Sequence, residues 1–357
     1  MSMGGPSKTI ILSPLDWGLG HASRCIPIAR ELIRTGFEPV LAGSGQSLEL
    51  ISKEFPELRT YELPSYNIRY PERSAYLKEK LILQIPSILK TVKKEYELTQ
   101  GIVEKEKAAG IISDNRFGVR SNQVESVYLT HQLLVKAGWM TGMATSWHRR
   151  LISKFDRCWV CDYQGEESLA GQLSNASEEL SSVSWIGPLS RFNSSESIEK
   201  DIDITVVLSG PEPSRSLFEE SIRKELQSFK GKLVLVRGLI EKEKSSKVDG
   251  NKTVYNFLLS DELQTLMKRS KLIISRSGYS SVMDLNALGG KALLVPTPGQ
   301  GEQEYLAQRL QSKGVCASVE QASFNMEAIE HAMNYPGFQT KKASKNELSN
   351  SLFDAFL

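Results

Sequence analysis

A histidine follows a glycine-rich turn near the start of the chain, in the run Gly18-Leu19-Gly20-His21. An apolar run before the turn predicts a strand, and an amphipathic pattern after it predicts a helix. Strand, glycine turn and helix in this order aim backbone N–H groups and the positive end of a helix dipole at a ligand. That positive end disfavours protonation of His21, so we expect a neutral imidazole that can accept a proton. The turn predicts a general base for a hydroxyl group, or alternatively a histidine that only begins a helix.

Two common glycine motifs do not fit this turn. The dinucleotide-binding fingerprint needs glycine in place of Ser23 and an acidic residue near the end of the second strand, where residues 42–45 read Ala-Gly-Ser-Gly. A P-loop needs Gly-Lys-Ser/Thr, which the sequence lacks. We therefore interpret Gly18, Leu19 and Gly20 as a ligand-binding loop of another kind.

A second run of small polar residues follows a predicted strand in the second half of the chain. Ser277, Gly278, Ser280 and Ser281 offer small side chains and N–H groups to a diphosphate at the start of a helix. Asp284, one helical turn further on, could accept hydrogen bonds from both hydroxyls of a ribose. The alternative for Asp284 is a capping box with Ser281.

Other polar residues at strand ends extend this predicted nucleotide site. Gln303 and Glu304 begin the next helix, where they could bind a hexose. Arg276 could contact the diphosphate or support the loop through an ion pair. The remaining candidates follow two further predicted strands, and they are Ser209, Gly210, Ser214, Arg215 and Arg237.

The first half of the chain has polar residues at the ends of two more predicted strands. Asp114, Asn115 and Arg116 follow one of them, and His131 follows the next. Open α/β sheets bind ligands at this edge. Asp114 is the alternative base if His21 is structural, and His131 either binds the second substrate or supports a loop.

Short apolar runs alternate with helical patterns along the chain, as in α/β domains with parallel sheets. Ten runs predict strands: 9–13, 39–42, 110–113, 126–130 and 158–161 in the first half, and 204–209, 232–236, 253–257, 272–275 and 292–295 in the second. We predict two Rossmann-like, doubly wound parallel-sheet domains that face each other across a cleft. Their boundaries are 1–187 and 188–357, and the last helix could cross back to the first domain.

Three other segments have distinct compositions. Residues 75–108 predict a long charged helix that Pro86 should break or kink. Residues 186–197 have the serine-rich composition of a linker between domains. Residues 241–252, rich in lysine and glutamate, predict a solvated loop.

The bulk composition indicates an ordinary globular protein, with 40% apolar and 24% charged residues. A formal charge of +2 argues against a dedicated nucleic-acid binder. Apolar runs are shorter than the ~18 residues of a membrane span, and the N-terminus lacks a signal core, so we expect the chain in the cytoplasm. Cys158 and Cys161 should point to opposite faces of a strand, which favours buried thiols over a metal site. We predict no cofactor and no metal.

The second half resembles the donor domain of the GT-B glycosyltransferases of family 28. Arg276, Ser277, Gly278 and Asp284 fall in register with that family's loop, in which an acidic residue, usually glutamate, binds the ribose of the nucleotide. Gln303 and Glu304 correspond to the pair that contacts the sugar. The resemblance also implies diphosphate contacts for the loop after residue 208 and inversion at the transferred sugar.

The first half resembles the same family at Gly18-Leu19-Gly20-His21, its glycine-rich acceptor loop, where a histidine is a proposed base. The run Trp-Gly-Leu-Gly-His over 17–21 is especially similar to an uncharacterised branch of predicted glycosyltransferases. Asn115, Arg116 and His131, at the strand ends of the same half, are predicted to bind the acceptor.

These features predict a metal-independent glycosyltransferase that moves a hexose or N-acetylhexosamine from a nucleotide sugar, UDP-linked by the resemblance, to an unknown hydroxyl acceptor. Two alternatives remain, a UDP-sugar 2-epimerase of the same fold and a non-catalytic nucleotide-sugar binder. One group of residues could give a weak contact with the inner face of the membrane, or form an ordinary solvated helix: Trp139, Trp147, Arg149, Arg150 and Lys154.

Overall fold

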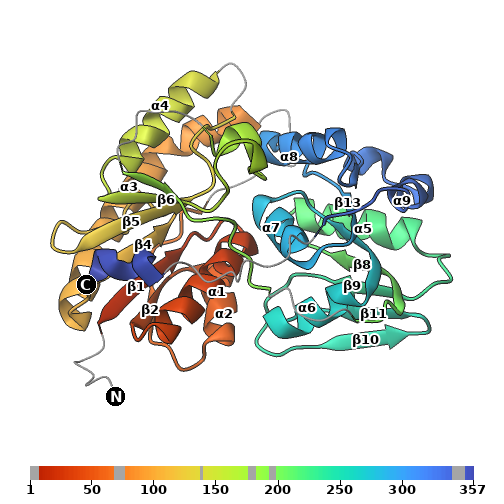
Figure 1. Ribbon diagram of the computed structural model, residues 1–357, viewed down its shortest axis with the longest axis horizontal. Coiled ribbons are helices and arrows are strands. Elements are labelled where there is room, and N and C mark those ends of the chain that lie inside the picture. Colours follow the sequence, from red (N-terminus) through yellow and green to blue (C-terminus); the bar gives the residue numbers. More distant parts are fainter. Residues whose placement is uncertain (1–7, 68–76, 137–139, 176–181, 193–197, 340–349) are drawn as a thin grey trace.

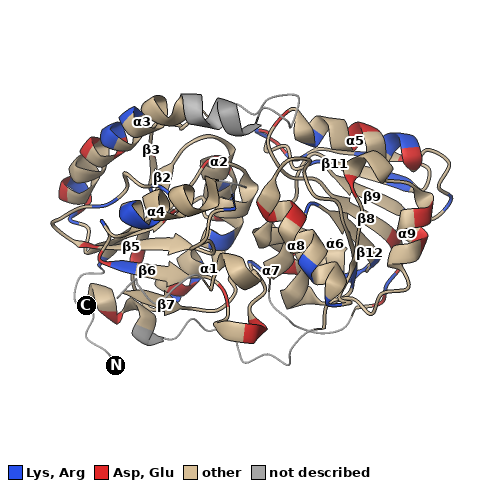
Figure 2. Cartoon of the chain, turned by 90° about the horizontal axis from the view of Figure 1, so that it is seen from above, with Lys and Arg blue, Asp and Glu red and all other residues tan. Residues whose placement is uncertain are grey.

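The computed structural model shows two α/β domains that lie side by side (Figure 1, Figure 2). Each domain has one seven-stranded sheet with helices on both faces. The structure describes residues 8–67, 77–136, 140–175, 182–192, 198–339 and 350–357. The predicted fold class, two Rossmann-like parallel-sheet domains, is confirmed.

The first sheet has the order β3-β2-β1-β4-β5-β6-β7, and all its neighbouring strands run parallel. This is the doubly wound order in which the chain starts in the middle and winds outward in both directions. The strands are β1 (Thr9–Pro14), β2 (Glu38–Gly43), β3 (Thr60–Glu62), β4 (Gly110–Asp114), β5 (Glu125–Thr130), β6 (Arg157–Val160) and β7 (Val183–Trp185).

The helices of the first domain are α1 (Leu19–Arg34), α2 (Gly45–Glu54), α3 (Leu77–Glu106) and α4 (Thr141–Ile152), with short 3-10 turns η3 (Gly165–Glu167) and η4 (Gly171–Leu173). Helix α1 forms where its apolar residues recur on one face, and Cys25, Ile28 and Leu32 of that face are buried. It ends before Gly36, whose φ of 87° suits glycine. The helix therefore begins directly at the glycine turn and carries His21 in its first turn.

The second sheet has the order β10-β11-β9-β8-β12-β13-β14. Its strands are β8 (Ile202–Val207), β9 (Leu233–Val236), β10 (Ser246–Asp249), β11 (Lys252–Tyr255), β12 (Ser270–Ser275), β13 (Lys291–Leu294) and β14 (Ala317–Ser318). The helices are α5 (Ser214–Glu225), α6 (Ser260–Lys268), α7 (Tyr279–Leu288), α8 (Gly301–Ser312) and α9 (Met326–Ala332), with η5 (Gln321–Ser323) and η6 (Asn350–Phe356) of 3-10 type. All neighbouring strands are parallel except β10 and β11, which form an antiparallel hairpin at the edge.

Alternate residues of the central strands fill separate cores on the two faces of each sheet. In β1, Ile10 and Leu12 pack on the α1 side, whereas Ile11 packs with residues of α3. In β12, Ile273 packs with α6 and α7, while Ile274 lies in the opposite core with α5. A strand buried on both faces needs a continuous apolar run, and this is why these strands were readable from the sequence.

All ten predicted strands are present, but one prediction about local structure is wrong. The segment 241–252 contains the exposed strand β10 in place of a solvated loop. It was missed because an edge strand of a hairpin needs little apolar surface. Of the break or kink predicted at Pro86, the break does not occur, since α3 continues through this residue.

The C-terminal turn η6 returns to the first domain and packs against it (Figure 1). Phe353 and Phe356 are buried, and both rings lie about 6 Å from the rings of Phe37 and Trp159. Lys8 donates to the backbone oxygen of Phe356 at 3.2 Å. Lys8 and the C-terminal turn η6 therefore contact each other at the first domain.

We predict that Phe353→Ala lowers the free energy of unfolding by about 3 kcal/mol, because it removes a buried ring from this aromatic group. Urea unfolding followed by tryptophan fluorescence measures the change. Leu357→Ala, at an exposed neighbouring position, is the control and should change that free energy by less than about 0.5 kcal/mol. Equal effects of the two substitutions would contradict the docking of η6.

Candidate active site

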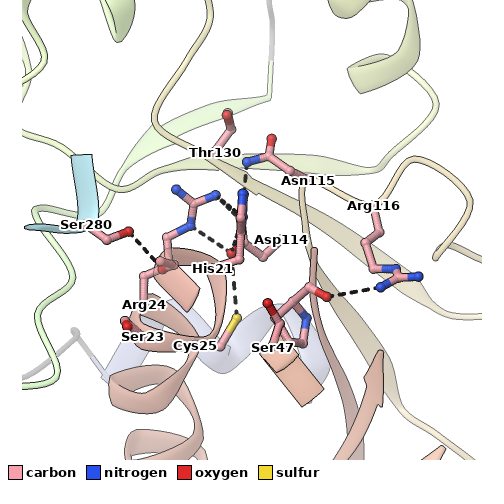
Figure 3. A network of polar contacts seen from close by, with 12 residues as sticks. His21, Ser23, Arg24, Cys25, Ser47, Asp114, Asn115, Arg116, Thr130 and Ser280 are labelled. Atoms are coloured by element: carbon pink, nitrogen blue, oxygen red, sulfur yellow. Dashed lines mark hydrogen bonds and ion pairs between the residues drawn. The ribbon is translucent and has the colours of Figure 1, made fainter. Parts of the chain in front are cut away.

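The carboxyl ends of the central strands of both sheets meet at the junction between the domains. Helix α1 begins after β1 in the first domain, and α7 begins after β12 in the second. The two helix N-termini touch, since Ser280 Oγ donates to the backbone oxygen of Gly20 at 2.8 Å (Figure 3). The predicted glycine turn and the predicted diphosphate loop therefore lie side by side.

Gly20 is required by this contact. A Cβ atom at Gly20 would lie 2.8 Å from Ser280 Oγ, closer than carbon and oxygen can approach without a shift. Gly18 has a φ of 126°, which favours glycine and lets the chain turn from β1 into α1. Gly18 thus allows the chain to turn, and Gly20 leaves room for the second domain to approach the turn.

His21 pairs with Asp114 from the end of β4 (Figure 3). Its Nδ1 lies 3.1 Å from Asp114 Oδ2, and 18% of its side chain is exposed, whereas Asp114 is fully buried. Burial lowers the pKa of His21 below 6.5, the Arg24 cation lowers it further, and Asp114 opposes both. The imidazole is thus neutral at pH 7, as expected from the sequence, although burial and Arg24 act here beside the helix dipole.

Arg24 holds Asp114 in place from the next turn of α1. Its Nε donates to Asp114 Oδ2 at 2.7 Å, and its Nη2 donates to Oδ1. Burial raises the pKa of Asp114, but Arg24 and then His21 outweigh burial, so the carboxylate stays charged with a lowered pKa. Arg24 was not predicted as a site residue, although its i+3 spacing from His21 placed it on the same helix face.

His131 connects this group to the second domain. Its Nδ1 lies 2.9 Å from Arg24 Nη1, and its Nε2 lies 2.9 Å from Oε1 of Glu302, at the start of α8. Its ring stacks on Tyr279 of α7, with 4.4 Å between centroids. Burial raises the pKa of Glu302, but the hydrogen bond from His131 together with the Arg24 cation outweighs burial, and the pKa is lowered. Glu302 was also missed, because Gln303 and Glu304 beside it matched the family pattern.

A histidine beside a buried carboxylate can act as a general base. The carboxylate accepts the proton of one ring nitrogen, which leaves the other nitrogen free to take a proton from a hydroxyl, and it stabilises the imidazolium that forms. Asp114 is enclosed by Arg24 and His21, so His21 is the member of the pair that solvent can reach.

The predicted donor residues after β12 and β13 form one connected set of loops. Ser277 Oγ donates to the backbone oxygen of Gln303 at 2.8 Å. The side chain of Gln303 accepts from the N–H of Thr297 at 2.9 Å, and that of Glu304 accepts from Gly299 at 2.8 Å. Gln303 and Glu304 therefore stabilise the loop before α8 in this structure.

Asp284 faces the linker between the domains. Its Oδ1 accepts from Ser190 Oγ at 2.8 Å, and its Oδ2 accepts from Arg191 Nε at 3.2 Å. Burial raises its pKa, partly offset by Arg191. The capping-box alternative is wrong, because Gly278 is the N-cap of α7 and Ser281 lies inside the helix.

Arg276 does not face the diphosphate loop, which corrects its prediction as a donor ligand. Its terminal nitrogens donate to the backbone oxygens of Val295, Pro296 and Ser214, and its guanidinium lies over the ring of Phe218. Burial lowers its pKa to about 10. The side chain ties three loops together inside the domain.

Arg215 and Arg237 form ion pairs with Glu219 of α5. Arg215 Nη1 lies 2.7 Å from Glu219 Oε2, and Arg237 Nε lies 2.9 Å from Oε1. Their charges are thus shared with a carboxylate in this structure. Ser209 and Gly210 lie half-buried in the loop that follows β8.

Arg116, which was predicted to bind the acceptor, has a structural role instead. It is fully buried, its Nε pairs with Glu95 Oε1 at 2.7 Å, and its other nitrogens bond to neighbouring loops. Asn115 adopts a positive φ of 58° and accepts from Tyr128 OH at 2.8 Å. Both residues shape the turn that presents Asp114.

Within the described ranges, three or more His, Cys, Asp or Glu side chains do not gather in a way that could hold a metal ion. Among those same residues, helices long and apolar enough to cross a bilayer are absent. The four cysteines are free and buried, as predicted for Cys158 and Cys161.

Comparisons with known proteins bear on both domains. Residues 213–352 match the glycosyltransferase family 28 C-terminal domain. An uncharacterised glycosyltransferase of Methanopyrus kandleri is 22% identical over 329 residues, which cover 86% of this chain and 92% of that protein. The UDP-N-acetylglucosamine–N-acetylmuramyl-(pentapeptide) pyrophosphoryl-undecaprenol N-acetylglucosamine transferase of Clostridium tetani is 24% identical over 349 residues, with 94% and 91% covered.

The fold is similar to that of solved glycosyltransferases. The SsfS6 glycosyltransferase of Streptomyces sp. SF2575, in complex with thymidine diphosphate, superimposes with a TM-score of 0.59 at 12% identity, and the match covers 98% of this chain and 95% of that one. The GT-B fold and the resemblance to family 28 are confirmed. None of these relatives supports the 2-epimerase alternative.

We predict that Gly20→Ala lowers the free energy of unfolding by about 1–2 kcal/mol, because the new methyl group collides with Ser280. Ser280→Ala in the Gly20→Ala background should recover part of the loss. Gly278→Ala is the matched control, since a Cβ atom there meets open space. A double-mutant cycle by urea unfolding measures the coupling, and additive effects would contradict the contact.

Proposed function

We propose that this glycosyltransferase of the family 28, GT-B type moves a hexose or N-acetylhexosamine from a UDP-sugar to an acceptor hydroxyl, with inversion and without a metal. The observation that carries the proposal is the His21–Asp114 pair, which lies directly beside the N-terminus of α7. A base and an anion-binding helix end on opposite domains are what a displacement between donor and acceptor requires.

Helix α7 is better suited to the diphosphate than α8 is. Its first turn contains Ser280 and Ser281 and is uncharged, whereas the first turn of α8 carries Glu302 and Glu304. A helix N-terminus attracts an anion unless a carboxylate already lies there. The diphosphate would lie against α7 and the sugar hydroxyls against the carboxylates of α8. The thymidine diphosphate complex of SsfS6 supports a nucleoside diphosphate on this fold.

The reaction would be a single displacement. The acceptor oxygen forms a bond to the anomeric carbon while the bond from that carbon to the diphosphate oxygen breaks, which inverts the carbon. The hydroxyl proton passes to Nε2 of His21, and the bonding pair leaves on the diphosphate. N–H groups at the start of α7 stabilise that charge.

We assign the base to His21 and the orienting role to Asp114. Arg24 already holds both oxygens of Asp114, so a proton taken by this carboxylate would cost one of two charge-assisted hydrogen bonds. His21 has a reachable ring and a lowered pKa, so it is free to accept a proton.

The acceptor is proposed to be carried at a membrane surface. The Clostridium tetani relative is named for an undecaprenol-linked acceptor. Met143 and Trp147 of α4 are 62% and 40% exposed, and Arg150 lies on the same face one turn further on. Apolar side chains beside a cation suit a headgroup region. Trp139, predicted as part of this group, lies outside the described residues.

His21→Ala should lower kcat by roughly 100- to 10,000-fold and leave nucleotide binding unchanged, because it removes the base alone. Asp114→Asn should lower kcat by a similar factor through loss of the orienting carboxylate. Transfer from a UDP-sugar to an acceptor in membrane extracts, followed by product analysis, measures both variants. His331→Ala, in the exposed part of α9, is the matched control and should keep full activity.

The acid limb of the same activity should lie below pH 6.5. A base works when it is unprotonated, and the lowered pKa of His21 keeps it unprotonated as the pH falls. An acid limb that persists unchanged in His21→Ala would contradict the assignment.

Asp284→Asn tests the donor side, where we propose that the carboxylate binds the ribose. We expect UDP binding to weaken by about tenfold or more, since a hydrogen bond to a charged group is lost. Isothermal titration calorimetry with UDP gives the value. Ser190→Ala is the control, since it keeps the Asp284 carboxylate and removes the hydrogen bonds of Ser190 with Asp284 and with the Phe192 N–H. Unchanged affinity in Asp284→Asn would leave Asp284 as an anchor of the linker.

A further inference from the structure

Arg24 is a buried cation in contact with one carboxylate and two imidazoles. Its Nε and Nη2 bond to the two oxygens of Asp114, its Nη2 also lies 2.8 Å from His21 Nδ1, and its Nη1 lies 2.9 Å from His131 Nδ1. A guanidinium has five N–H donors and accepts no hydrogen bond. Each imidazole nitrogen that bonds to Arg24 must therefore be an acceptor without a proton.

This rule fixes the protonation of His131. Its Nδ1 accepts from Arg24, so the ring proton lies on Nε2, where it donates to Glu302 at 2.9 Å. Both ring nitrogens then have a hydrogen-bond partner, with one proton on the ring. His131 is thus held between Arg24 of one domain and Glu302 of the other.

The same rule creates a competition at His21. Its Nδ1 lies 2.8 Å from Arg24 Nη2 and 3.1 Å from Asp114 Oδ2. It cannot accept from the guanidinium and donate to the carboxylate together. When it accepts from Arg24, the proton is on Nε2 and the base is idle. When it donates to Asp114, Nε2 is free to take a proton from the acceptor.

We propose that Arg24 is the positioning residue of the base: it keeps Asp114 charged, fixes the proton of His131, and competes with Asp114 for Nδ1 of His21. This inference rests on the proposed function of His21 and extends it to the choice of ring nitrogen. Nη2 keeps its bond to Asp114 Oδ1 in both states of His21. The exchange of partners also moves the ring proton, because Nε2 must release its proton to solvent and Nδ1 must take one up before it can donate to Asp114.

The electrostatic surroundings of His21 give Arg24 a second effect. Arg24 opposes protonation of His21, and Asp114 favours it. Glu302 lies on the far side of His131 and also favours it. The thiols of Cys25 and Cys161 are neutral, since burial raises both pKa values. Without Arg24 the two carboxylates would act unopposed, and the pKa of His21 should rise.

The test is nitrogen-15 NMR of histidine-labelled full-length protein, which reports the tautomer and the pKa of each ring. In the wild type we expect His131 protonated on Nε2. In Arg24→Met we expect the pKa of His21 to rise, the tautomer of His131 to lose its preference, and kcat to fall by about tenfold or more. The acid limb of activity should move to higher pH with the NMR pKa.

Two further variants make the result specific. Arg24→Lys keeps the positive charge but lacks the forked N–H donors of a guanidinium. It should therefore keep the pKa of His21 low but leave the tautomer of His131 without its preference. Arg34→Met, at a half-exposed position of α1 paired with Glu31, is the matched control and should change none of these readouts.

The outcomes separate the two proposals. An unchanged pKa and tautomer in folded Arg24→Met, or His131 protonated on Nδ1 in the wild type, would overturn the role of Arg24. A shifted pKa of His21 with an unmoved acid limb would instead overturn His21 as the base. The wild-type tautomer decides the question even if Arg24→Met does not fold.

Discussion

The N-termini of α1 and α7 meet at a single hydrogen bond between Ser280 and Gly20, and the rest of the site depends on this approach. Two positive helix ends this close repel each other unless something negative lies beside them. Asp114 lies beside the first turn of α1. The first turn of α7 is uncharged, so its positive end is left for a ligand. One helix end therefore supports the base, and the other is available for the leaving group.

The central strands could be predicted because they are buried on both faces, which demands unbroken apolar runs such as Ile10 to Leu12. The edge strands β3, β7, β10 and β14 could not, since they are short or half-solvated and their residues resemble loops. The turn at Gly18 and Gly20 was visible as a pattern. The contact that requires glycine at position 20 was not visible, because its partner Ser280 belongs to the other domain and lies 260 residues away along the chain.

The partners of three buried arginines could not be predicted from the sequence. Arg24, Arg116 and Arg276 all lie near strand ends or glycine turns, and all three are buried. The charge of Arg24 is paired with a carboxylate of the site, and that of Arg116 with the structural carboxylate Glu95. Arg276 instead donates to backbone oxygens and lies over an aromatic ring. Sequence position alone cannot distinguish these cases, because each partner comes from a distant segment. Only Arg24, at helical spacing from the histidine, had a local signal.

The charges at the junction suit a site that must receive a proton. One guanidinium, Arg24, stands against the two carboxylates Asp114 and Glu302, and neutral imidazoles leave one net negative charge. A proton that moves to His21 brings the group to neutrality, so the transfer is favoured where burial would otherwise oppose a new cation. A diphosphate at α7 would add negative charge nearby and would oppose the lowering of the His21 pKa by burial and Arg24. The donor would thus strengthen the base at the moment when both substrates are bound, whereas Arg24 keeps the same base neutral without it.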